Sequence, residues 1–485
     1  MVSALPVVAL VGRLVVLYAS LMLVPLAFAL GQHDAAKRAF VVAISITFAA
    51  GAGVSLLTWR HRRELKPRDG FMLVTLTWLV LPAFSALPLL MSVPGITFTQ
   101  AYFEAMSALT ATGATALSGL DALPLSVNVW RCFMQWIGGL GIIVLAVAIL
   151  PLLGVGGSQL FSAEFTGPIK DQKLTPRIAD TARALWVVYL VLSVACFLAY
   201  GAAGMSWSDA FMHMSSTVSL GGFSSHDTSF GYWNSPGIEA VAVVFMLLAG
   251  VNLTLYFVML RHRSTRPLLG NPEVRGFYAL LGIGIAVIAA YLVVQGQYAT
   301  AWLALRHSVF HVVSVATTTG YASDNYALWP TFAPLMMILL GCFATCAGST
   351  GGGIKMIRLI LLVKQARHEL VRIVHPSVVN PVVVGGRTVS DRLIGGVIAY
   401  MMIYGASIVM LTMLLLFTGL DPVSAFTAVL ACFNNIGPGL GEVGPASNYG
   451  ALSAGQTWIC TCAMLLGRLE LLTVVVLFTR HFWRV

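Results

Sequence analysis

The sequence predicts an all-α polytopic membrane protein built from a repeated unit around one axis. Of its 485 residues, 58% are hydrophobic and only 9% are charged, and the mean hydropathy is +0.87. Soluble proteins carry roughly 25% charged residues, so a water-soluble enzyme is excluded. Apolar runs of about 20 residues match a hydrocarbon layer of ~30 Å. The polar–apolar alternation of outer-membrane strands is missing, which favours helices over a barrel.

Apolar runs between charged or Pro/Gly-rich breaks predict about ten full spans. They fall near residues 7–30, 39–59, 71–92, 130–153, 184–204, 237–260, 276–295, 331–363 (interrupted), 394–418 and 457–480. Shorter segments of moderate hydrophobicity lie between some of them, near residues 99–112, 208–221, 305–319 and 422–436. These segments are too short to cross the membrane, so we expect them to be re-entrant half-helices.

The basic residues predict the orientation of the chain. Most of the 28 Lys and Arg gather on one side, in the segments Arg60–Arg68, Lys170–Arg183, Arg261–Arg275, Lys355–Arg392 and Arg480–Arg484. The positive-inside rule makes this side cytoplasmic, so we expect both termini inside and all four half-helices entering from outside. Acidic residues outnumber basic ones on the outer side, which concentrates cations there. The net charge of +10 reflects this topology and affinity for anionic lipid, not nucleic-acid binding.

The sequence gives no support for catalysis. It contains no nucleophile–base pair, phosphate-binding glycine loop or Cys-x-x-Cys set. Its seven cysteines lie in or beside apolar stretches, where we expect them to be packing residues without a disulfide framework. A membrane-embedded enzyme or redox subunit would need paired histidines across spans or facing carboxylates at mid-depth, and neither is seen.

The four half-helices share one sequence pattern, which ends in a small polar turn centred on glycine. The turn glycines are Gly113, Gly222, Gly320 and Gly437. A hydroxyl or amide residue lies three positions before each of them, at Thr110, Ser219, Thr317 and Asn434. A unit of span, half-helix and span is therefore used four times along the chain.

This pattern predicts an ion pathway. Four half-helices that point inward from one face aim their partly negative C-terminal ends at a common centre. The extended backbone that follows each half-helix has free carbonyls, which are tolerated at membrane depth only along a wet pathway or around an ion. Carbonyls of four such turns replace the hydration shell of a monovalent cation, as in potassium-channel filters. Close packing of Gly and Thr in helices is the alternative, but it explains neither the short segments nor their return to the outer face.

Several of these motifs resemble the TrkH family, the membrane subunits of bacterial Trk potassium uptake systems in the Trk/Ktr/HKT superfamily of K+ transporters. They are the Thr-Thr-Gly and Leu-Gly-Gly turns, the interruption Gly348–Gly353 and the run Gly437–Glu442. The resemblance covers essentially the whole chain. It implies two extra N-terminal transmembrane helices (residues 1–66) and four pore repeats around one pseudo-fourfold pore (residues 67–160, 161–270, 271–376 with an intramembrane loop, and 377–485).

The resemblance also implies which residues contact the ion. Backbone carbonyls that bind K+ would come from Ala111, Thr112, Leu220, Gly221, Thr318, Thr319, Asn435 and Ile436, and Gly113, Gly222, Gly320 and Gly437 would be the filter glycines. A glycine at position 113 favours potassium over sodium. The second and fourth turns depart from Thr-Thr-Gly, so we expect an asymmetric filter with looser selectivity than a true potassium channel. No covalently bound cofactor is implied.

The interrupted eighth span predicts a gate. Gly348, Ser349, Thr350, Gly351, Gly352 and Gly353 cannot hold a stable helix, because each glycine costs ~1 kcal/mol relative to alanine. A loop at membrane depth beneath a filter fits a gate, and the family has an intramembrane loop here; a packing kink is the alternative.

A second gating element is predicted at Arg468, in the middle of the last span. A charge there costs ~3 kcal/mol or more and faces a polar interior. We expect Arg468 to face the pore below the filter and to raise the barrier to cations; a structural salt bridge to another helix is the alternative. Glu470, two positions on, points away from it on a helix.

The resemblance further implies partners and location. The basic segment of residues 364–376 either lies on anionic membrane lipid or docks a cytosolic regulator, which in relatives is TrkA, a nucleotide-binding ring. Relatives also form homodimers. We therefore expect a multi-pass protein of the bacterial inner membrane that takes up K+, passively or coupled to an ion gradient. A less selective K+/Na+ or proton-coupled symporter on the same scaffold is the alternative.

Overall fold

The computed structural model describes residues 5–60, 67–141 and 178–483, and this part of the chain is almost entirely helical. Its strands are the two-residue β1 (Val383–Val384) and β2 (Arg387–Thr388), which pair antiparallel. The prediction of an all-α membrane fold is confirmed. We call the face at which the half-helices begin the outer face, following the orientation that the basic residues predict.

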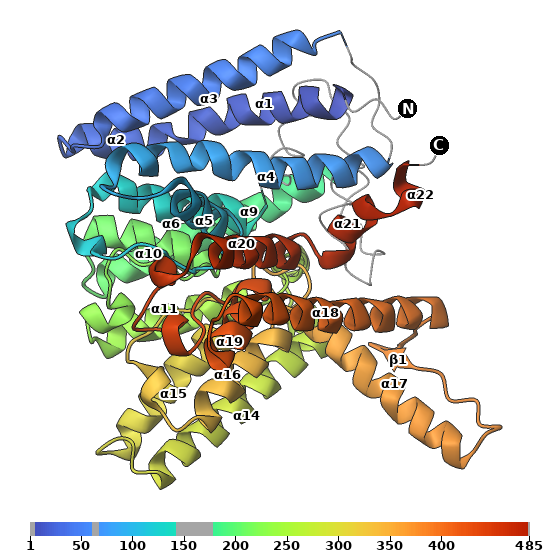
Figure 1. Cartoon of the computed structure of the whole chain (residues 1–485). Coiled ribbons are helices and arrows are strands. Elements are labelled where there is room, and N and C mark those ends of the chain that lie inside the picture. Colours follow the sequence, from blue (N-terminus) through green and yellow to red (C-terminus); the bar gives the residue numbers. More distant parts are fainter. Residues whose placement is uncertain (1–4, 61–66, 142–177, 484–485) are drawn as a thin grey trace.

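Six helical segments of the described chain are long and apolar enough to cross a membrane. They are α1 (Leu5–Leu21) with α2 (Leu23–Gly31), α3 (Lys37–Leu57), α4 (Pro67–Ser92), α9 (Ile178–Ala202), α14 (Pro272–Val294) and α18 (Asp391–Phe417). Figure 1 shows α1, α2 and α3 together at one edge of the molecule, beside α4. The chain is thus a multi-pass membrane protein with additional N-terminal helices.

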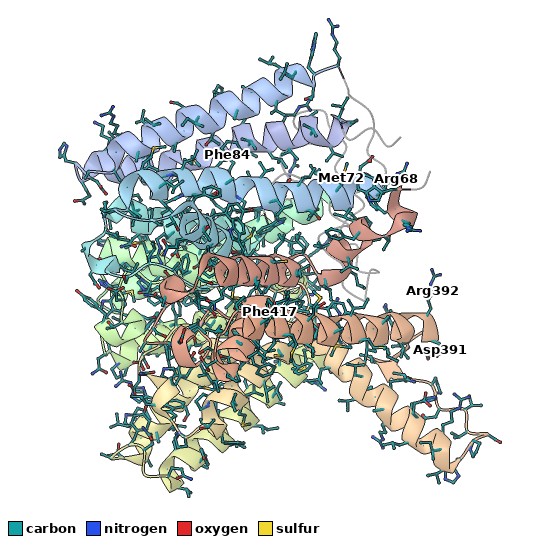
Figure 2. All side chains as sticks on the ribbon, in the orientation of Figure 1. Arg68, Met72, Phe84, Asp391, Arg392 and Phe417 are labelled. Carbon is teal, nitrogen blue, oxygen red and sulfur yellow. The ribbon has the colours of Figure 1, made fainter. Side chains whose placement is uncertain are left out.

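The surface of these helices is suited to lipid. Figure 2 shows Asp391 and Arg392 at one end of α18 and Phe417 at the other. Phe417 is 91% exposed in the isolated chain. Helix α18 is long and apolar enough to cross a membrane, with charged residues at one end and an exposed aromatic side chain at the other, which suits a membrane-spanning helix.

The four predicted half-helices are present as short helices of 12 to 16 residues. They are α5 (Phe98–Leu109), α10 (Trp207–Val218), α15 (Ala301–Ala316) and α19 (Pro422–Phe433). Each begins at a polar N-cap whose side chain accepts a first-turn backbone N–H, namely Thr97, Ser206, Thr300 or Asp421. Such caps satisfy the free N–H groups of a helix start, which explains why each half-helix begins where it does.

The helix that follows each half-helix begins near the outer face and stops at membrane depth. These helices are α6 (Leu125–Gly139), α11 (Pro236–Ala249), α16 (Phe332–Phe343) and α20 (Ala454–Arg468). Beyond the stops lie α12 (Leu253–His262), α17 (Met356–Val374) and α21 (Leu471–Val475). The interruption predicted within 331–363 is confirmed. The expected span at 130–153 runs into residues 142–153, which lie outside the described residues.

Two predicted continuous spans are wrong. The span at 237–260 is bent by 84° between α11 and α12, and the span at 457–480 is bent by 107° between α20 and α21. At the first bend, the Asn252 side chain accepts the Thr254 N–H at 2.9 Å and starts a new helix. At the second, Glu470 has φ of 51°, a left-handed conformation that cannot continue an α-helix.

Short elements complete the chain. The turns return to the outer face through 3₁₀ helices, which are η1 (Leu120–Ala122), η3 (Ser229–Tyr232), η4 (Tyr326–Leu328), η5 (Gly441–Val443) and η6 (Tyr449–Ala451). On the opposite face lie α13 (Arg266–Leu269), η7 (Val476–Phe478) and α22 (Arg480–Trp483). Figure 1 shows α17 extending away from the bundle on this same side.

Two glycines allow a helix backbone to contact the end of the preceding half-helix directly. A Cβ atom added at Gly138 in α6 would lie 1.8 Å from the carbonyl oxygen of Leu109, at the end of α5. A Cβ added at Gly467 in α20 would lie 1.8 Å from the carbonyl oxygen of Phe433, at the end of α19. Repeats 1 and 4 therefore use the same close approach, which holds the end of each half-helix against the helix that follows it.

Replacing Gly138 by alanine should destabilise the protein, because the new methyl group overlaps a backbone oxygen that cannot move aside. Overpacking of this kind costs about 1–3 kcal/mol. The measurement is the temperature at which half of the detergent-purified protein loses its monodisperse peak in size-exclusion chromatography. Gly282→Ala in α14 is the matched control, since nothing lies within 4 Å of its added Cβ. Equal effects of the two substitutions would contradict the close approach.

Candidate ion pathway

The four glycine turns form one closed ring. A Cβ atom added at any turn glycine would collide with, or closely approach, a carbonyl oxygen of the next turn. The distances from the added Cβ are Gly113 to Gly221 O 2.3 Å, Gly222 to Thr319 O 1.8 Å, Gly320 to Ile436 O 2.1 Å and Gly437 to Thr112 O 2.8 Å. Because the sequence of contacts returns to its start, the turns encircle a single axis. The expected convergence of the turns is therefore seen in the structure.

The backbone has the same conformation in all four turns. The residue two positions before each glycine is left-handed, with φ of 51° at Ala111, 55° at Leu220, 62° at Thr318 and 54° at Asn435. The glycines have φ of 84°, 77°, 86° and 95° in the same order. Left-handed backbone at a non-glycine residue costs of order 1–3 kcal/mol and persists only where the surroundings enforce it. Four repetitions at one register indicate a functional constraint on the turn.

Hydrogen bonds back to the half-helix enforce this conformation. The N–H of the residue before each turn glycine donates to the carbonyl of the residue five positions earlier, in the half-helix. The four bonds are all 2.8 Å long and join Thr112 to Ser107, Gly221 to Ser216, Thr319 to Ser314 and Ile436 to Ala431. The polar side chains three positions before the glycines donate to the carbonyl of the residue four positions earlier. Thr110, Ser219, Thr317 and Asn434 donate to Met106, Ser215, Val313 and Leu430, respectively. The turn N–H groups are thus used internally, which leaves the turn carbonyls directed elsewhere.

These carbonyls are the candidate ligands. Among the described residues, no group donates a hydrogen bond to the carbonyls of Thr112, Thr319 or Ile436, whereas that of Gly221 accepts one from Gln135 at 2.6 Å. Free carbonyls at the ends of four converging half-helices create a negative site that suits a dehydrated monovalent cation. All eight residues predicted to supply carbonyls lie in these turns.

The segment just outside the first turn is held by a buried ion pair that the sequence did not predict. Arg131 in α6 contacts Glu104 in α5 at 2.7 Å, and neither side chain is exposed. Glu104 accepts the N–H of Ala116 at 2.9 Å, and Arg131 donates to the Ser224 carbonyl at 3.2 Å. The pair therefore links the segments that follow the first and second turns.

Repeats 2 and 3 carry histidines at the position of Glu104 and use them for the same purpose. Nε2 of His213 lies 3.0 Å from Oγ of Ser224, and Nε2 of His311 accepts the N–H of Ser323 at 3.2 Å. In repeat 4 the neighbouring Thr427 accepts the N–H of Leu440 at 2.9 Å. Each side chain bonds to the extended segment beyond its turn, so these residues support the ring of turns. Among the described residues, no group of three or more His, Cys, Asp and Glu is arranged to hold a metal ion.

The interrupted span places its loop directly beneath the ring. The N–H of Gly352 donates to Oγ1 of Thr318 at 2.9 Å, and Oγ1 of Thr350 donates to the Val218 carbonyl at 3.0 Å. A Cβ added at Gly352 would lie 2.2 Å from the carbonyl oxygen of Asn434. The loop therefore touches three of the four turn regions, and its glycines allow this contact.

Arg468 contacts both the loop and the end of α6. Its Nη1 donates to the Thr350 carbonyl at 3.0 Å, and its Nη2 donates to the carbonyls of Gly138 and, at 2.9 Å, Gly139. Glu470 instead pairs with Arg358 at the start of α17, at 2.6 Å. The expectation that Arg468 and Glu470 point apart agrees with these contacts.

The other broken helix also holds the loop. The Cys346 N–H donates to the Gly250 carbonyl, and the Leu253 N–H donates to the Gly348 carbonyl, both at 3.1 Å. Glu273 at the start of α14 accepts the N–H of Ala347 at 2.6 Å. The end of α6 thus contacts Arg468, and the breaks of repeats 2 and 4 contact the loop of repeat 3.

Sequence reasoning missed Glu273, Asn252 and Gln135 as parts of this site. Asn252 and Gln135 are isolated polar residues in apolar runs, which is the signal that could have found them. Glu273 lies in the charged segment Arg261–Arg275, where a carboxylate gives no signal.

A cavity of about 70 Å³ opens on the outer side of the ring, lined by three of the turn glycines together with Asp227 and His226. The His226 ring bonds through Nδ1 to Asp121, and its Nε2 lies 3.4 Å from Asp209. Burial alone would lower the pKa of His226, but hydrogen bonds to Asp209 and Asp121 outweigh burial and raise the pKa above its usual value. The His226 ring therefore joins the outer segments of repeats 1 and 2 through its contact with Asp121.

Comparisons with known proteins agree with this geometry. The sequence pattern of the family TrkH, described as cation transport protein, matches residues 36–484. The chain is 44% identical over 478 residues to the Trk system potassium uptake protein TrkH of Escherichia coli (strain K12), covering 98% of each chain. It is 43% identical over 481 residues to TrkH of Vibrio parahaemolyticus, covering 99% of each. The crystal structure of the potassium transporter TrkH from Vibrio parahaemolyticus superposes with a TM-score of 0.90 at 40% identity, over 100% of both chains.

The cluster around His226 predicts a pH-dependent stability. A histidine whose folded pKa is raised stabilises the protein fully below its unfolded pKa of about 6.5, and this contribution is lost as the pH rises through the folded value. The difference in unfolding temperature between the parent protein and His226→Gln should therefore be larger at pH 6 than at pH 9. His262→Gln, exposed at the end of α12, is the control. A difference that grows with pH would contradict the charged cluster.

Proposed function

The chain belongs to the TrkH family of cation transport proteins, and on that basis we propose that it is the membrane subunit of a Trk-type potassium uptake system in the bacterial inner membrane. The relatives that it matches over nearly their whole length are potassium uptake proteins. The observation that carries the proposal within this chain is the closed ring of glycine turns. K+ is the substrate that passes through this ring.

In this proposal, K+ is coordinated by the backbone carbonyls of the four turns. The ligands are those of Ala111, Thr112, Leu220, Gly221, Thr318, Thr319, Asn435 and Ile436. Fixed carbonyl dipoles replace the water that the ion leaves behind, and the strained left-handed residues keep the carbonyls in place. Gly113, Gly222, Gly320 and Gly437 are required because a side chain would occupy the space of a neighbouring carbonyl.

We further propose that the loop of Gly348, Ser349, Thr350, Gly351, Gly352 and Gly353 is the gate and that Arg468 stabilises its closed position. The loop lies against the inner side of the ring through Gly352 and Thr318. A positive guanidinium bound to the Thr350 carbonyl opposes the passage of a cation by Coulomb repulsion in a low-dielectric site. Opening then requires that the hydrogen bonds of Arg468 and Gly352 be exchanged for water or other partners.

Regulation by a cytosolic TrkA-like nucleotide-binding ring and assembly as a homodimer are part of the same proposal. Helix α17 begins at the gate loop and extends away from the bundle on the side of both chain ends (Figure 1). Arg358 in its first turn is paired with Glu470, so a partner that moves α17 acts on the residues next to Arg468. Both termini are cytoplasmic in this arrangement, and the basic face of α17 is also suited to anionic lipid.

The proposed ion path predicts that Gly222→Ala abolishes potassium uptake. The added methyl group would lie 1.8 Å from the Thr319 carbonyl oxygen at a residue with φ of 77°. In a bacterial strain that lacks its own potassium uptake systems, the parent chain should restore growth at low K+, and Gly222→Ala should reduce K+ uptake at least about tenfold, the effect of a barrier raised by ~1.4 kcal/mol. Gly405→Ala in α18, where nothing lies within 4 Å, is the control. Normal uptake by Gly222→Ala at normal expression would refute the path.

The proposed gate predicts that Arg468→Ala increases cation flux, because it removes both the positive barrier and the bond that holds the loop. The measurement is K+ flux into proteoliposomes per folded protein, without any partner added. Arg468→Lys, which keeps the charge but not the bidentate contacts, should give an intermediate rise. Unchanged or lower flux in Arg468→Ala would exclude the barrier role. Imposed sodium or proton gradients in the same vesicles separate passive flow from symport.

A further inference from the structure

The second turn lacks a side chain at a position where the other three have one. The residue before the turn glycine is Thr112, Gly221, Thr319 or Ile436 in the four repeats. The two threonines bond to the hydroxyls of Thr110 and Thr317, at 2.7 and 2.8 Å, and so fix their own turns from behind. Gly221 offers no such support, although its carbonyl is part of the same ring.

The side chain of Gln135 occupies the empty position. A Cβ added at Gly221 would lie 2.5 Å from Cδ of Gln135. Nε2 of Gln135 donates to the Gly221 carbonyl at 2.6 Å, and its Oε1 accepts the N–H of Phe223 at 3.1 Å. One fully buried amide thus holds the backbone on both sides of the filter glycine Gly222.

The position of Gln135 is itself fixed by its helix. Arg131 lies one turn earlier on α6 and binds the Ser224 carbonyl, while the buried Glu104 holds its guanidinium. Four residues after Gln135, a Cβ added at Gly139 would lie 2.5 Å from Cβ of Ser219 at the end of α10. Because α6 is locked against repeat 2 at both points, the Gln135 amide has little freedom to follow a moving turn.

We propose that Gln135 is a positioning residue that determines the cation selectivity of the filter, because its amide replaces the missing side chain of the second turn and fixes the Gly221 carbonyl. The inference rests on the proposed coordination of K+ by the turn carbonyls. A carbonyl oxygen has two lone pairs; one accepts from Gln135, and the other is directed toward the ring. Gly221 is the only one of the eight proposed ligand carbonyls for which the described chain supplies a side-chain amide donor.

The consequence for selectivity follows from ion size. A ring that discriminates K+ from Na+ must resist contraction around the smaller ion, or must present carbonyls of limited field strength. The Gln135 amide does both at Gly221, since it restrains the oxygen and its N–H dipole offsets part of the negative potential that the oxygen presents to an ion. Without the amide, the Gly221 carbonyl is free to approach a smaller ion, so Na+ should pass more readily.

The test compares K+ and Na+ fluxes into proteoliposomes under equal gradients. Gln135→Ala and Gln135→Met should each lower the K+/Na+ flux ratio by about fivefold, the effect of one ordinary hydrogen bond. Methionine keeps nearly the length of glutamine but has no N–H donor. Gln295→Met, exposed at the outer end of α14, is the matched control. A flux ratio that stays at the parent value in both Gln135 variants would overturn the proposal, and because the ratio comes from functioning protein, it does not depend on expression.

A double variant makes the test specific for the missing side chain. Gly221→Thr alone should impair uptake, because its Cβ overlaps the Gln135 amide. Gln135→Ala combined with Gly221→Thr gives the second turn the threonine that the first and third turns have, so the K+/Na+ ratio should return toward the parent value. The double variant could instead have a K+/Na+ flux ratio lowered by the product of the two single effects. In that case Gln135 does not replace a side chain at Gly221, and the proposal would be wrong.

Failure of this inference is distinguishable from failure of the proposed ion path. If Gly222→Ala abolishes uptake while the Gln135 variants keep the parent ratio, the ring conducts K+ and only the role of Gln135 is refuted. If Gly222→Ala leaves uptake unchanged, the ring is not the path, and both proposals fall.

Discussion

The structure depends on one constraint, which is that a backbone carbonyl within a membrane needs a partner. The half-helices α5, α10, α15 and α19 stop at membrane depth, so the backbone that follows them loses its helical hydrogen bonds. Its N–H groups bond back to the half-helix over five residues, and its carbonyls are left to face the axis. The glycines that permit this conformation also leave space for it, because each lies against a carbonyl of the next turn. An ion pathway is the arrangement in which these carbonyls have a partner.

The same constraint explains the parts below the ring. Where α6, α11, α16 and α20 stop, further carbonyls become free, and several of them accept hydrogen bonds from backbone N–H groups of neighbouring segments or from a long side chain. The Gly250 carbonyl accepts the Cys346 N–H, while Arg468 satisfies the carbonyls of Gly139 and Thr350. The glycine turns, the loop and Arg468 are therefore joined by hydrogen bonds into one polar column. A displacement of the loop changes hydrogen bonds at the ring because the two share Gly352 and Thr318.

The sequence predicted the elements whose signal is local and repeated. Apolar length identified the membrane spans, and the recurrence of glycine after short segments identified the turns at Gly113, Gly222, Gly320 and Gly437. The bend at residues 250–252 was missed because a single polar residue in an apolar run is compatible with a continuous span, and the bend at residues 469–470 was missed because Arg468 and Glu470 were placed on one continuous helix. Their stability comes from partners distant in sequence, as in the pair of Glu470 with Arg358. Gln135 was missed for the same reason, since only the packed fold brings it to Gly221.

The repeats agree in their backbone and differ in the side chains that support it, and this difference has a physical origin. The φ angles of the turns and the hydrogen bonds over five residues belong to the main chain. A repeat without this backbone conformation would not place a free carbonyl at the axis. The support behind each turn only has to supply a donor or an acceptor at the right place, which Glu104 with Arg131, His213, His311 and Thr427 all achieve. Fourfold symmetry is therefore required of the turn backbone at the axis but not of the side chains that support it. Under the proposed coordination of K+ by the turn carbonyls, ion selectivity depends on the surrounding shell as well as on the ring, because the side chains that hold each turn restrain its carbonyls.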